Sequence, residues 1–559
     1  MDTRIKIIFL VDYKEYYGIE KTIEDANNLI KNIPSSTLIN YISGFNIHLY
    51  LNEQDSKIQQ ELIYSLFNRM ENRAIEQLQN RTQELFSQHK MNIIYFWNYS
   101  NYLFYDLIFK NYNDLPCRDL TSQEAQSFFD AYLILNGIAN ELINPATPDF
   151  ADDKNKNNME RLIITNFIQQ RDFVSNLDFR NQITRCLGLF EYIENHSNYS
   201  KFIKGYYNHK QTSGYLDLLK TISWLIVATD FTQSNNARKQ IITITQDGIK
   251  IGINRSIIQS LCINNDIGTY DNKKIWTKPL FKISKDKYYV LDINFLINQL
   301  YKSQIFEFNS YLKNNNVKSD FLSDKGKEFS EEIYLRDIIK TCFPDYIKFF
   351  GTDCINNKNE ELCDVYLRDN DKICLIEFKD TLFNDSIKQN RKVSQTLDEL
   401  DKKFFTNQKG KPKGVTQLAN AVKDINSNGI KFDPDIPKQI KIFPIVLYTD
   451  NAFGMDGINY LYIPKFKNQI TNQNCDIDIF DVTFINLSYL EMHEEVFTNK
   501  SIDIFNIIGE YHKHIKEDKY KYTPFEIFSR FYMNKIKAPD MPQSKRFQKA
   551  TEKILNIKN

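Results

Sequence analysis

The feature that most constrains the fold of this chain is a short apolar segment, residues 373–376, that leads directly into Glu377-Phe378-Lys379. Four consecutive apolar residues indicate a central β-strand that is covered on both faces. Residues two apart on a strand share a face, so Glu377 and Lys379 project together. Phe378 then points to the opposite face, into the core.

A second strand is predicted at residues 362–367, and it carries Asp364. The turn-forming residues 368–371 fold the following strand back beside it. We therefore expect the side chains of Asp364, Glu377 and Lys379 to converge at the end of the sheet.

These three residue types suit the cleavage of a phosphodiester bond. Carboxylates bind a hard divalent cation, and Mg²⁺ is typically held by one or two of them together with water and substrate phosphate. The cation activates water and polarises the phosphate. Lys379 could orient the nucleophile or offset the charge that builds up on phosphorus. The pattern is typical of a metal-dependent nuclease.

The triplet has a structural alternative, because a chain with 71 acidic and 71 basic residues contains Glu-x-Lys triplets by chance. Glu517-Asp518-Lys519 is one of these, and no apolar strand leads into it. The apolar residues before Glu377 favour a site in a crevice at a strand end. An ordinary ion pair at the end of a strand remains the alternative.

Residues 320–450 resemble the core of the PD-(D/E)XK nuclease superfamily. The resemblance implies a restriction-endonuclease-like αβββαβ core, in which Asp364 matches the Asp of the motif and Glu377-Phe378-Lys379 its E-x-K. Cys363 stands where the Pro of the motif would be. The first helix would be residues 325–342, the second helix residues 415–425, and the fourth strand residues 439–450.

The resemblance also implies a metal site. Mg²⁺, with Mn²⁺ as a substitute, would be held by Asp364, Glu377 and the backbone carbonyl of Phe378.

In many members of this superfamily a Glu on the first helix joins the site. We prefer Glu332, because it shares a helix face with Leu335 and Ile339, which must pack on the sheet. Glu328 and Glu331 remain alternatives, and so does a solvated acidic first turn that the helix dipole favours.

A basic segment precedes the second helix. Lys409, Lys411 and Lys413 alternate with Gly and Pro, so they indicate a loop rather than a helix or a strand. Lysine clusters and helix N-termini attract phosphate, and we expect this loop to bind nucleic acid beside the metal site. Gln417 matches a residue that some branches of the superfamily use there. A solvated charge run and a helix-surface Gln are the alternatives.

The length of 559 residues indicates several domains. We predict a multidomain α/β protein with a mixed, mostly helical N-terminal region, a small β-rich module, the nuclease core and a helical C-terminal region with a basic tail. These regions are residues 1–235, 236–305, 306–470 and 471–559.

Periodicity predicts further elements outside the core. The N-terminal region has strand-like segments at 5–11 and 93–97 and one long amphipathic helix over 55–88. The β module has hairpins at 241–253 and 280–291, followed by a helix at 295–303. The C-terminal region has helices at 487–497, 502–515 and 523–535, and the tail from residue 537 is expected to be disordered.

Composition limits the partners. The formal net charge is zero, so a nucleic-acid surface must be a local basic patch. No apolar run reaches the 18 residues of a membrane span. The eight cysteines form no C-x-x-C pair, which favours reduced, mostly buried thiols in a cytoplasmic protein.

We therefore expect a Mg²⁺-dependent endonuclease that acts on DNA in preference to RNA. The resemblance implies uses such as restriction and phage defence. A sequence-specific restriction endonuclease is one alternative, and a non-catalytic nucleic-acid-binding or assembly protein with a degenerate core is another. Cleavage of both strands by one site per chain would require a homodimer or a partner protein.

Overall fold

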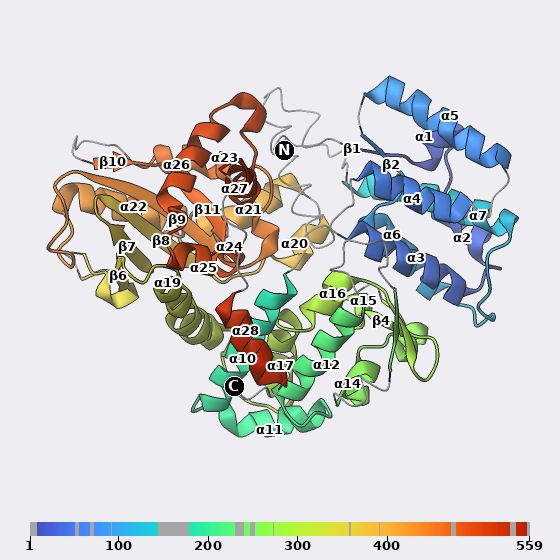
Figure 1. Cartoon of the computed structure of the whole chain (residues 1–559), viewed down its shortest axis with the longest axis horizontal. Coiled ribbons are helices and arrows are strands. Elements are labelled where there is room, and N and C mark those ends of the chain that lie inside the picture. Colours follow the sequence, from blue (N-terminus) through green and yellow to red (C-terminus); the bar gives the residue numbers. More distant parts are fainter. Residues whose placement is uncertain are drawn as a thin grey trace. The chain divides into compact units, whose positions relative to one another are not determined.

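The computed structural model describes residues 8–50, 55–67, 72–90, 92–143, 178–229, 240–245, 252–271, 273–356, 359–390, 392–470, 477–536 and 544–555. They form a mixed α/β protein in which helices predominate (Figure 1). Contacts group them into two compact units. The first is residues 320–548, and the second combines the described residues before 320 with those from 549 on. The division into four regions stays a prediction.

The first unit is built on a mixed sheet, which among the described residues has the order β10-β9-β8-β7-β6, with β11 also paired to β9 (Figure 1). β8 lies between antiparallel β7 and parallel β9, as its apolar sequence predicts for a central strand. The strands are β6 (Ile347–Phe350), β7 (Val365–Asp369), β8 (Lys372–Lys379), β9 (Ile440–Tyr448), β10 (Ile477–Ile479) and β11 (Thr483–Asn486).

The connection between β7 and β8 is a two-residue turn, in which Asn370 has a φ of 55°. Asn readily adopts this left-handed conformation in tight hairpins, so the predicted turn is confirmed. β7 begins at Val365, later than predicted, because the N–H of Leu362 donates instead to the carbonyl of Cys354 at 2.7 Å. Asp364 therefore lies just before the strand.

Helices cover both faces of this sheet. Leu418 of α22 belongs to the apolar core on one face, together with Tyr366 and Leu375 of the strands. On the other face, the ring of Phe505 in α26 lies 4.9 Å from that of Phe443. The helices of the unit are α18 (Phe321–Asp324), π-helix η2 (Lys325–Leu335), α19 (Arg336–Cys342), η3 (Gly351–Asp353), α20 (Asp385–Asn390), α21 (Val393–Phe404), α22 (Val415–Asn428), η4 (Asn451–Phe453), α23 (Ile458–Lys467), α24 (Leu487–Met492), α25 (Glu494–Thr498), α26 (Ile504–Ile515), η5 (Asp518–Tyr520) and α27 (Phe525–Lys535). The last helix, α28 (Lys545–Leu555), belongs to the first unit up to residue 548 and to the second unit from residue 549.

Two predictions for the C-terminal region are wrong. The expected helix over 487–497 divides at His493 into α24 and α25. The tail was expected to be disordered, but α28 is helical; residues 537–543 lie outside the described residues. Ala550 and Ile554 of α28 are buried four residues apart on one helix face, and Arg546 binds Glu494 at 2.9 Å, which stabilises the helix.

The second unit contains a parallel pair, β1 with β2, and an antiparallel sheet of order β3-β5-β4. The strand predicted at 5–11 is confirmed for residues 8–10, whereas residues 5–7 lie outside the described residues. The strand predicted near 93–97 and the hairpin at 280–291 are confirmed. The hairpin at 241–253 is only partly testable, because residues 246–251 lie outside the described residues, and β3 pairs with β5 instead. These strands are β1 (Ile8–Leu10), β2 (Asn92–Ile94), β3 (Ile241–Thr243), β4 (Leu280–Lys282) and β5 (Lys287–Val290).

Helices make up most of the second unit. The helix predicted over 55–88 is seen as α4 and α5, and residues 68–71 between them lie outside the described residues. The helix predicted at 295–303 is divided between α16 and α17. The helices are α1 (Tyr13–Tyr17), α2 (Ile23–Ile30), α3 (Ser35–Leu49), α4 (Ser56–Phe67), α5 (Asn72–His89), α6 (Asn98–Lys110), α7 (Ser122–Ile143), α10 (Phe179–Asn195), α11 (Ser200–His209), α12 (Tyr215–Ala228), α14 (Arg255–Ser260), η1 (Asn264–Thr269), α15 (Lys274–Thr277), α16 (Ile293–Asn298) and α17 (Lys302–Asn314).

The described residues bear on two further predictions, the absence of a membrane span and the state of the cysteines. None of the described helices combines the length and the apolar character needed to cross a bilayer. The cysteines of the described residues are free thiols, and all except Cys117 are buried.

Candidate active site

Asp364, Glu377 and Lys379 lie together at one end of β7 and β8. The register pairs Val365 with Ile376, so Asp364 lies opposite Glu377. Asp364 Oδ2 accepts a hydrogen bond of 2.6 Å from the backbone N–H of Phe378. Lys379 Nζ donates to Glu377 Oε2 at 2.8 Å. The two strands thus bring both carboxylates and the ammonium to one place.

A group of three carboxylates forms the accessible part of the site. Oxygen atoms of Glu331, Glu361 and Asp364 all lie within 4.8 Å of one another. Glu331 comes from η2 and Glu361 from the loop before β7. Hard cations such as Mg²⁺ prefer oxygen ligands, so this donor set fits a divalent cation.

The helix residue of this group is Glu331, whereas the sequence-based preference was Glu332. Glu332 is exposed and lies outside the group, and Glu328 lies outside it too. The preference assumed an α-helical period of 3.6 residues. Residues 325–335 instead form a π-helix, whose i→i+5 bonds widen each turn and change which residues share a face.

Glu361 is not among the site residues predicted from the sequence. It lies three residues before Asp364 on the loop whose bridge to Ile355 turns the chain back. Gly351 makes room for it, because a Cβ there would lie 3.3 Å from Glu361 Oε1, and its φ of 47° also favours glycine. The acidic pair Glu360-Glu361 close before Asp364 was the available signal.

The carboxylates repel one another in a partly dry environment. Burial, followed by the charge of Asp364, raises the pKa of Glu377 to about 8. Burial, Asp364 and Glu361 raise the pKa of Glu331 to about 7. Burial also raises the pKa of Asp364, against the opposing effect of Lys379. These raised pKa values mean that the negative charge of the carboxylates is incompletely compensated, and a divalent cation would compensate it.

Lys379 remains protonated within this group. Its side chain is 15% exposed and that of Glu377 only 2%. Burial alone would lower the pKa of Lys379, but Glu377 and Asp364 outweigh burial and raise it. The ammonium is a permanent positive charge beside the acidic group.

Gln417 positions this ammonium. Its Oε1 accepts from Lys379 Nζ at 3.2 Å and from the N–H of Gly414 at 2.8 Å. Gly414 has a φ of 42°, and a Cβ there would lie 3.0 Å from the carbonyl oxygen of Phe404. Only glycine fits this position easily, so the start of α22 is closely defined.

Further cations surround the carboxylates. Lys413 lowers the pKa of Asp364, and Lys327 and Arg336 lower that of Glu361, each against the larger effect of burial. Lys409 and Lys411 are exposed on the turn that the bridge between Thr406 and Pro412 closes. The predicted loop is thus present, and Lys413 is the lysine of this loop whose charge lowers the pKa of Asp364.

An ion pair that is only slightly exposed stabilises the start of η2, with exposed side-chain fractions of 7% for Lys325 and 14% for Asp380. Lys325 Nζ donates to Asp380 Oδ2 at 2.5 Å, and Thr449 Oγ1 donates to Asp380 Oδ1 at 2.8 Å. Burial would raise the pKa of Asp380, but the interactions with Lys325 and Thr449 outweigh the effect of burial and lower this pKa. These bonds join the start of the helix that carries Glu331 to the ends of β8 and β9.

Comparisons with protein-family models, with curated proteins and with solved structures give no match to this chain. The function must therefore be argued from the geometry of the site.

Proposed function

We propose that the chain is a Mg²⁺-dependent nuclease that hydrolyses phosphodiester bonds, with DNA as the preferred substrate. The observation that carries the proposal is the group of Glu331, Glu361 and Asp364 at the end of adjacent strands, where Glu377 lies opposite Asp364 and binds the ammonium of Lys379. The order of elements from α18 to β9 supports it. This order is a helix, three strands, further helices and a strand, as in a restriction-endonuclease-like core.

The acidic group fits the cation that this chemistry requires. Asp364, Glu331 and Glu361 would hold Mg²⁺ or Mn²⁺, and Glu377 would join them on loss of its proton. The backbone carbonyl of Phe378 stays a predicted ligand. When bound, the cation supplies Lewis acidity towards the phosphate and the attacking water.

The other residues of the site would bind and orient the substrate. Lys379, fixed by Gln417, can donate hydrogen bonds to a water or to a phosphate oxygen as negative charge develops. Lys327, Arg336 and Lys413 flank the carboxylates and would neutralise the phosphates next to the scissile one.

Lys409 and Lys411 are exposed nearby in sequence on the same turn as Lys413. They would contact the nucleic-acid backbone farther from the scissile bond, where their contribution depends strongly on salt.

The test is an assay of the full-length chain on plasmid DNA with Mg²⁺ or Mn²⁺. We expect cleavage that EDTA, Asp364→Asn and Lys379→Met each abolish, whereas Glu332→Gln retains it. Discrete fragments would indicate a sequence-specific restriction enzyme, and a smear a non-specific nuclease. Full activity in Glu377→Gln would show that the site is wrongly assigned. The proposal would be refuted if well-folded protein left DNA and RNA intact, in both single-stranded and double-stranded form.

A further inference from the structure

The helix that carries Glu331 has an unusual conformation for its length. η2 is π-helical over 11 residues, whereas most π-helices are a single turn within an α-helix. A rare backbone conformation persists where the surrounding structure holds it. The contacts at the two ends of η2 therefore decide which of its side chains reach the carboxylate group.

Each end of η2 is held by a polar side chain. Lys325 at its start binds Asp380, as described above. Near its end, the hydroxyl of Tyr334 donates to Glu491 Oε1 at 2.6 Å, and both of these side chains are buried. Tyr334 lies three residues after Glu331, so this bond fixes the turn of the helix that directly follows the site residue.

The last helix of the chain reaches the same tyrosine. The guanidinium of Arg546 in α28 lies over the ring of Tyr334, 5.7 Å from its centroid, which is within the range of a cation–π contact. Arg546 Nε also donates to Glu494 Oε2 at 2.9 Å, and its Nη1 donates to the carboxylate of Asp337. Because two carboxylates bind different nitrogens of one planar group, the orientation of the guanidinium over the ring is fixed.

The charge of Arg546 suits this position. Burial raises the pKa of Glu494, against the opposing charge of Arg546. Burial would lower the pKa of Arg546, but Tyr334, Glu494 and Asp337 outweigh the effect of burial and raise this pKa. Loss of the guanidinium would leave the buried Glu494 without this compensation and would uncover the ring of Tyr334.

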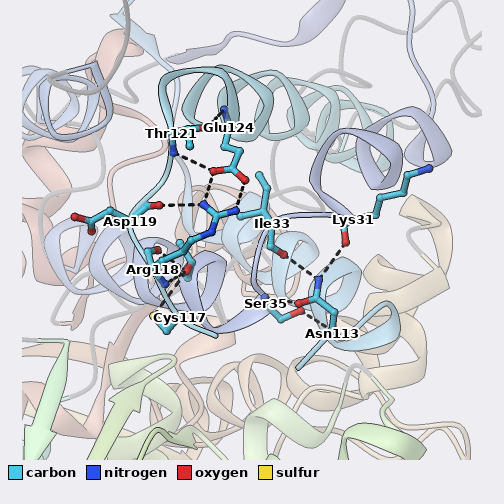
Figure 2. Close-up of polar contacts among 10 residues, drawn as sticks. Lys31, Ile33, Ser35, Asn113, Cys117, Arg118, Asp119, Thr121 and Glu124 are labelled. Carbon is cyan, nitrogen blue, oxygen red and sulfur yellow. Dashed lines mark hydrogen bonds and ion pairs between the residues drawn. The ribbon is translucent and has the colours of Figure 1, made fainter. Parts of the chain in front are cut away.

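A second arginine, Arg118, forms a pair that is purely local (Figure 2). It makes two hydrogen bonds of 2.6 Å to the carboxylate of Glu124, which also accepts from the N–H of Thr121 at 2.9 Å. The residues drawn there all belong to the second unit. Arg546 instead joins residues 52 and 209 positions away, all within the first unit. Arg118 therefore serves as a control for the loss of an arginine–carboxylate pair that does not reach η2.

We propose that Arg546 is a positioning residue for the metal site. Through the ring that it covers, it holds η2 in the π-helical register that brings Glu331 to the carboxylate group. Without this contact, η2 would adopt the α-helical period of α19, which follows it directly. In that period Glu332 shares the face of Leu335 and Ile339, and Glu331 would leave the group. The inference rests on the metal site of the proposed function and makes the start of α28 a part of that site.

The experiment is a double-mutant cycle on the Mn²⁺ affinity of the full-length chain, measured by electron paramagnetic resonance. In the wild-type background, Glu331→Gln should weaken binding at least about tenfold, since even residues that only orient metal ligands are worth about 10–100-fold. Arg546→Met should weaken binding by about tenfold for the same reason. Added to Arg546→Met, Glu331→Gln should then cost less than about threefold more, because Glu331 has already left the group.

A milder variant tests the same step. Tyr334→Phe removes only the hydroxyl that binds Glu491, and it should show the same pattern with a smaller loss of affinity. If Arg546→Met alone does not fold, addition of Glu494→Gln removes the uncompensated charge but does not restore the contact with the ring.

Two control variants should keep the affinity of the wild type for Mn²⁺. Lys545→Met removes the neighbouring, exposed cation of α28, which pairs with Glu495 at 3.1 Å. Arg118→Met removes the local pair of the second unit. A role of Arg546 in stability alone would lower the melting temperature in the same way as these controls, without changing the Mn²⁺ affinity of the folded protein.

The outcomes separate this inference from the proposed function. An unchanged Mn²⁺ affinity in folded Arg546→Met, or losses for Arg546→Met and Glu331→Gln that simply add, would overturn the inference and leave the proposed nuclease intact. Mn²⁺ binding that Glu331→Gln does not weaken would overturn the metal site and the inference together. The expected coupling without any cleavage of nucleic acid would support the inference and refute only the nuclease.

Discussion

Replacement of Glu331 by glutamine should stabilise the metal-free protein at alkaline pH. The pKa of this carboxyl is about 7 in the fold against an ordinary value of 4.5. Between these two pH values the folded state holds a proton that the unfolded state has lost. The free energy of unfolding therefore falls as the pH rises through this window. Above pH 7 Glu331 is ionised in both states, and the full loss of stability is present.

The size of the effect follows from the shift in pKa. About 2.5 pK units correspond to at most about 3 kcal/mol, at about 1.36 kcal/mol per unit. Solvent screens the half-buried carboxylate, and Asp364 and Glu361 share the repulsion, so we expect Glu331→Gln to gain about 1–3 kcal/mol at pH 8. At pH 4.5 the carboxyl is protonated and resembles the amide, so the gain should nearly vanish.

Urea unfolding followed by far-UV circular dichroism, with EDTA at pH 4.5 and 8, measures this gain. Glu332→Gln is the matched control, because Glu332 is the exposed neighbour outside the group, and it should change stability by no more than about 0.5 kcal/mol. Mg²⁺ should reverse the order of the variants by binding wild type more tightly. An equal stability of the two variants at pH 8, or a gain that is the same at both pH values, would refute the reasoning.

Three further predictions concern the supports of the site and its cation. Lys325→Met should cost about 3–5 kcal/mol, because it leaves Asp380 charged and buried, and addition of Asp380→Asn should recover part of this loss in thermal unfolding. Gly414→Ala should destabilise the fold by about 1–3 kcal/mol, measured in the same way, because its φ of 42° and a backbone carbonyl at 3.0 Å oppose a Cβ. Mn²⁺ should bind more tightly as the pH rises from 6 to 8, because binding should release protons from Glu331 and Glu377. Calorimetry in buffers of different ionisation enthalpy would detect these protons. An affinity for Mn²⁺ that does not change with pH would contradict this prediction.

The sequence predicted those parts of the site that depend on local pattern. The apolar strand before Glu377 and the period of two that places Lys379 on the same face are properties of a few neighbouring residues. The turn at Asn370 then fixed the register that places Asp364 opposite Glu377. Each of these steps needs only short-range information.

The parts that failed depend on distant contacts or on an unusual backbone. Glu331 replaced Glu332 because η2 is a π-helix, which a period of 3.6 residues does not anticipate. Glu361 reaches the site only because the chain turns back between Cys354 and Leu362. The pairing of Lys325 with Asp380 joins residues 55 positions apart, and no local pattern marks it.

Glu377 and Asp380, at the end of β8, show the difference between a carboxylate that stabilises the fold and one that is suited to bind a cation. The side chain of Asp380 is only 14% exposed, and its partners Lys325 and Thr449 lower its pKa below the ordinary value, as expected for a carboxylate that stabilises the fold. Glu377, only three positions earlier, has a pKa of about 8 although Lys379 lies 2.8 Å away. An ion pair with a purely structural role would favour the charged form of both partners. Here burial and the other carboxylates oppose the charged form of Glu377. The negative charge of the carboxylates is therefore incompletely compensated, and a bound cation would compensate it. This is the physical reason for preferring a metal site to an ordinary strand-end ion pair.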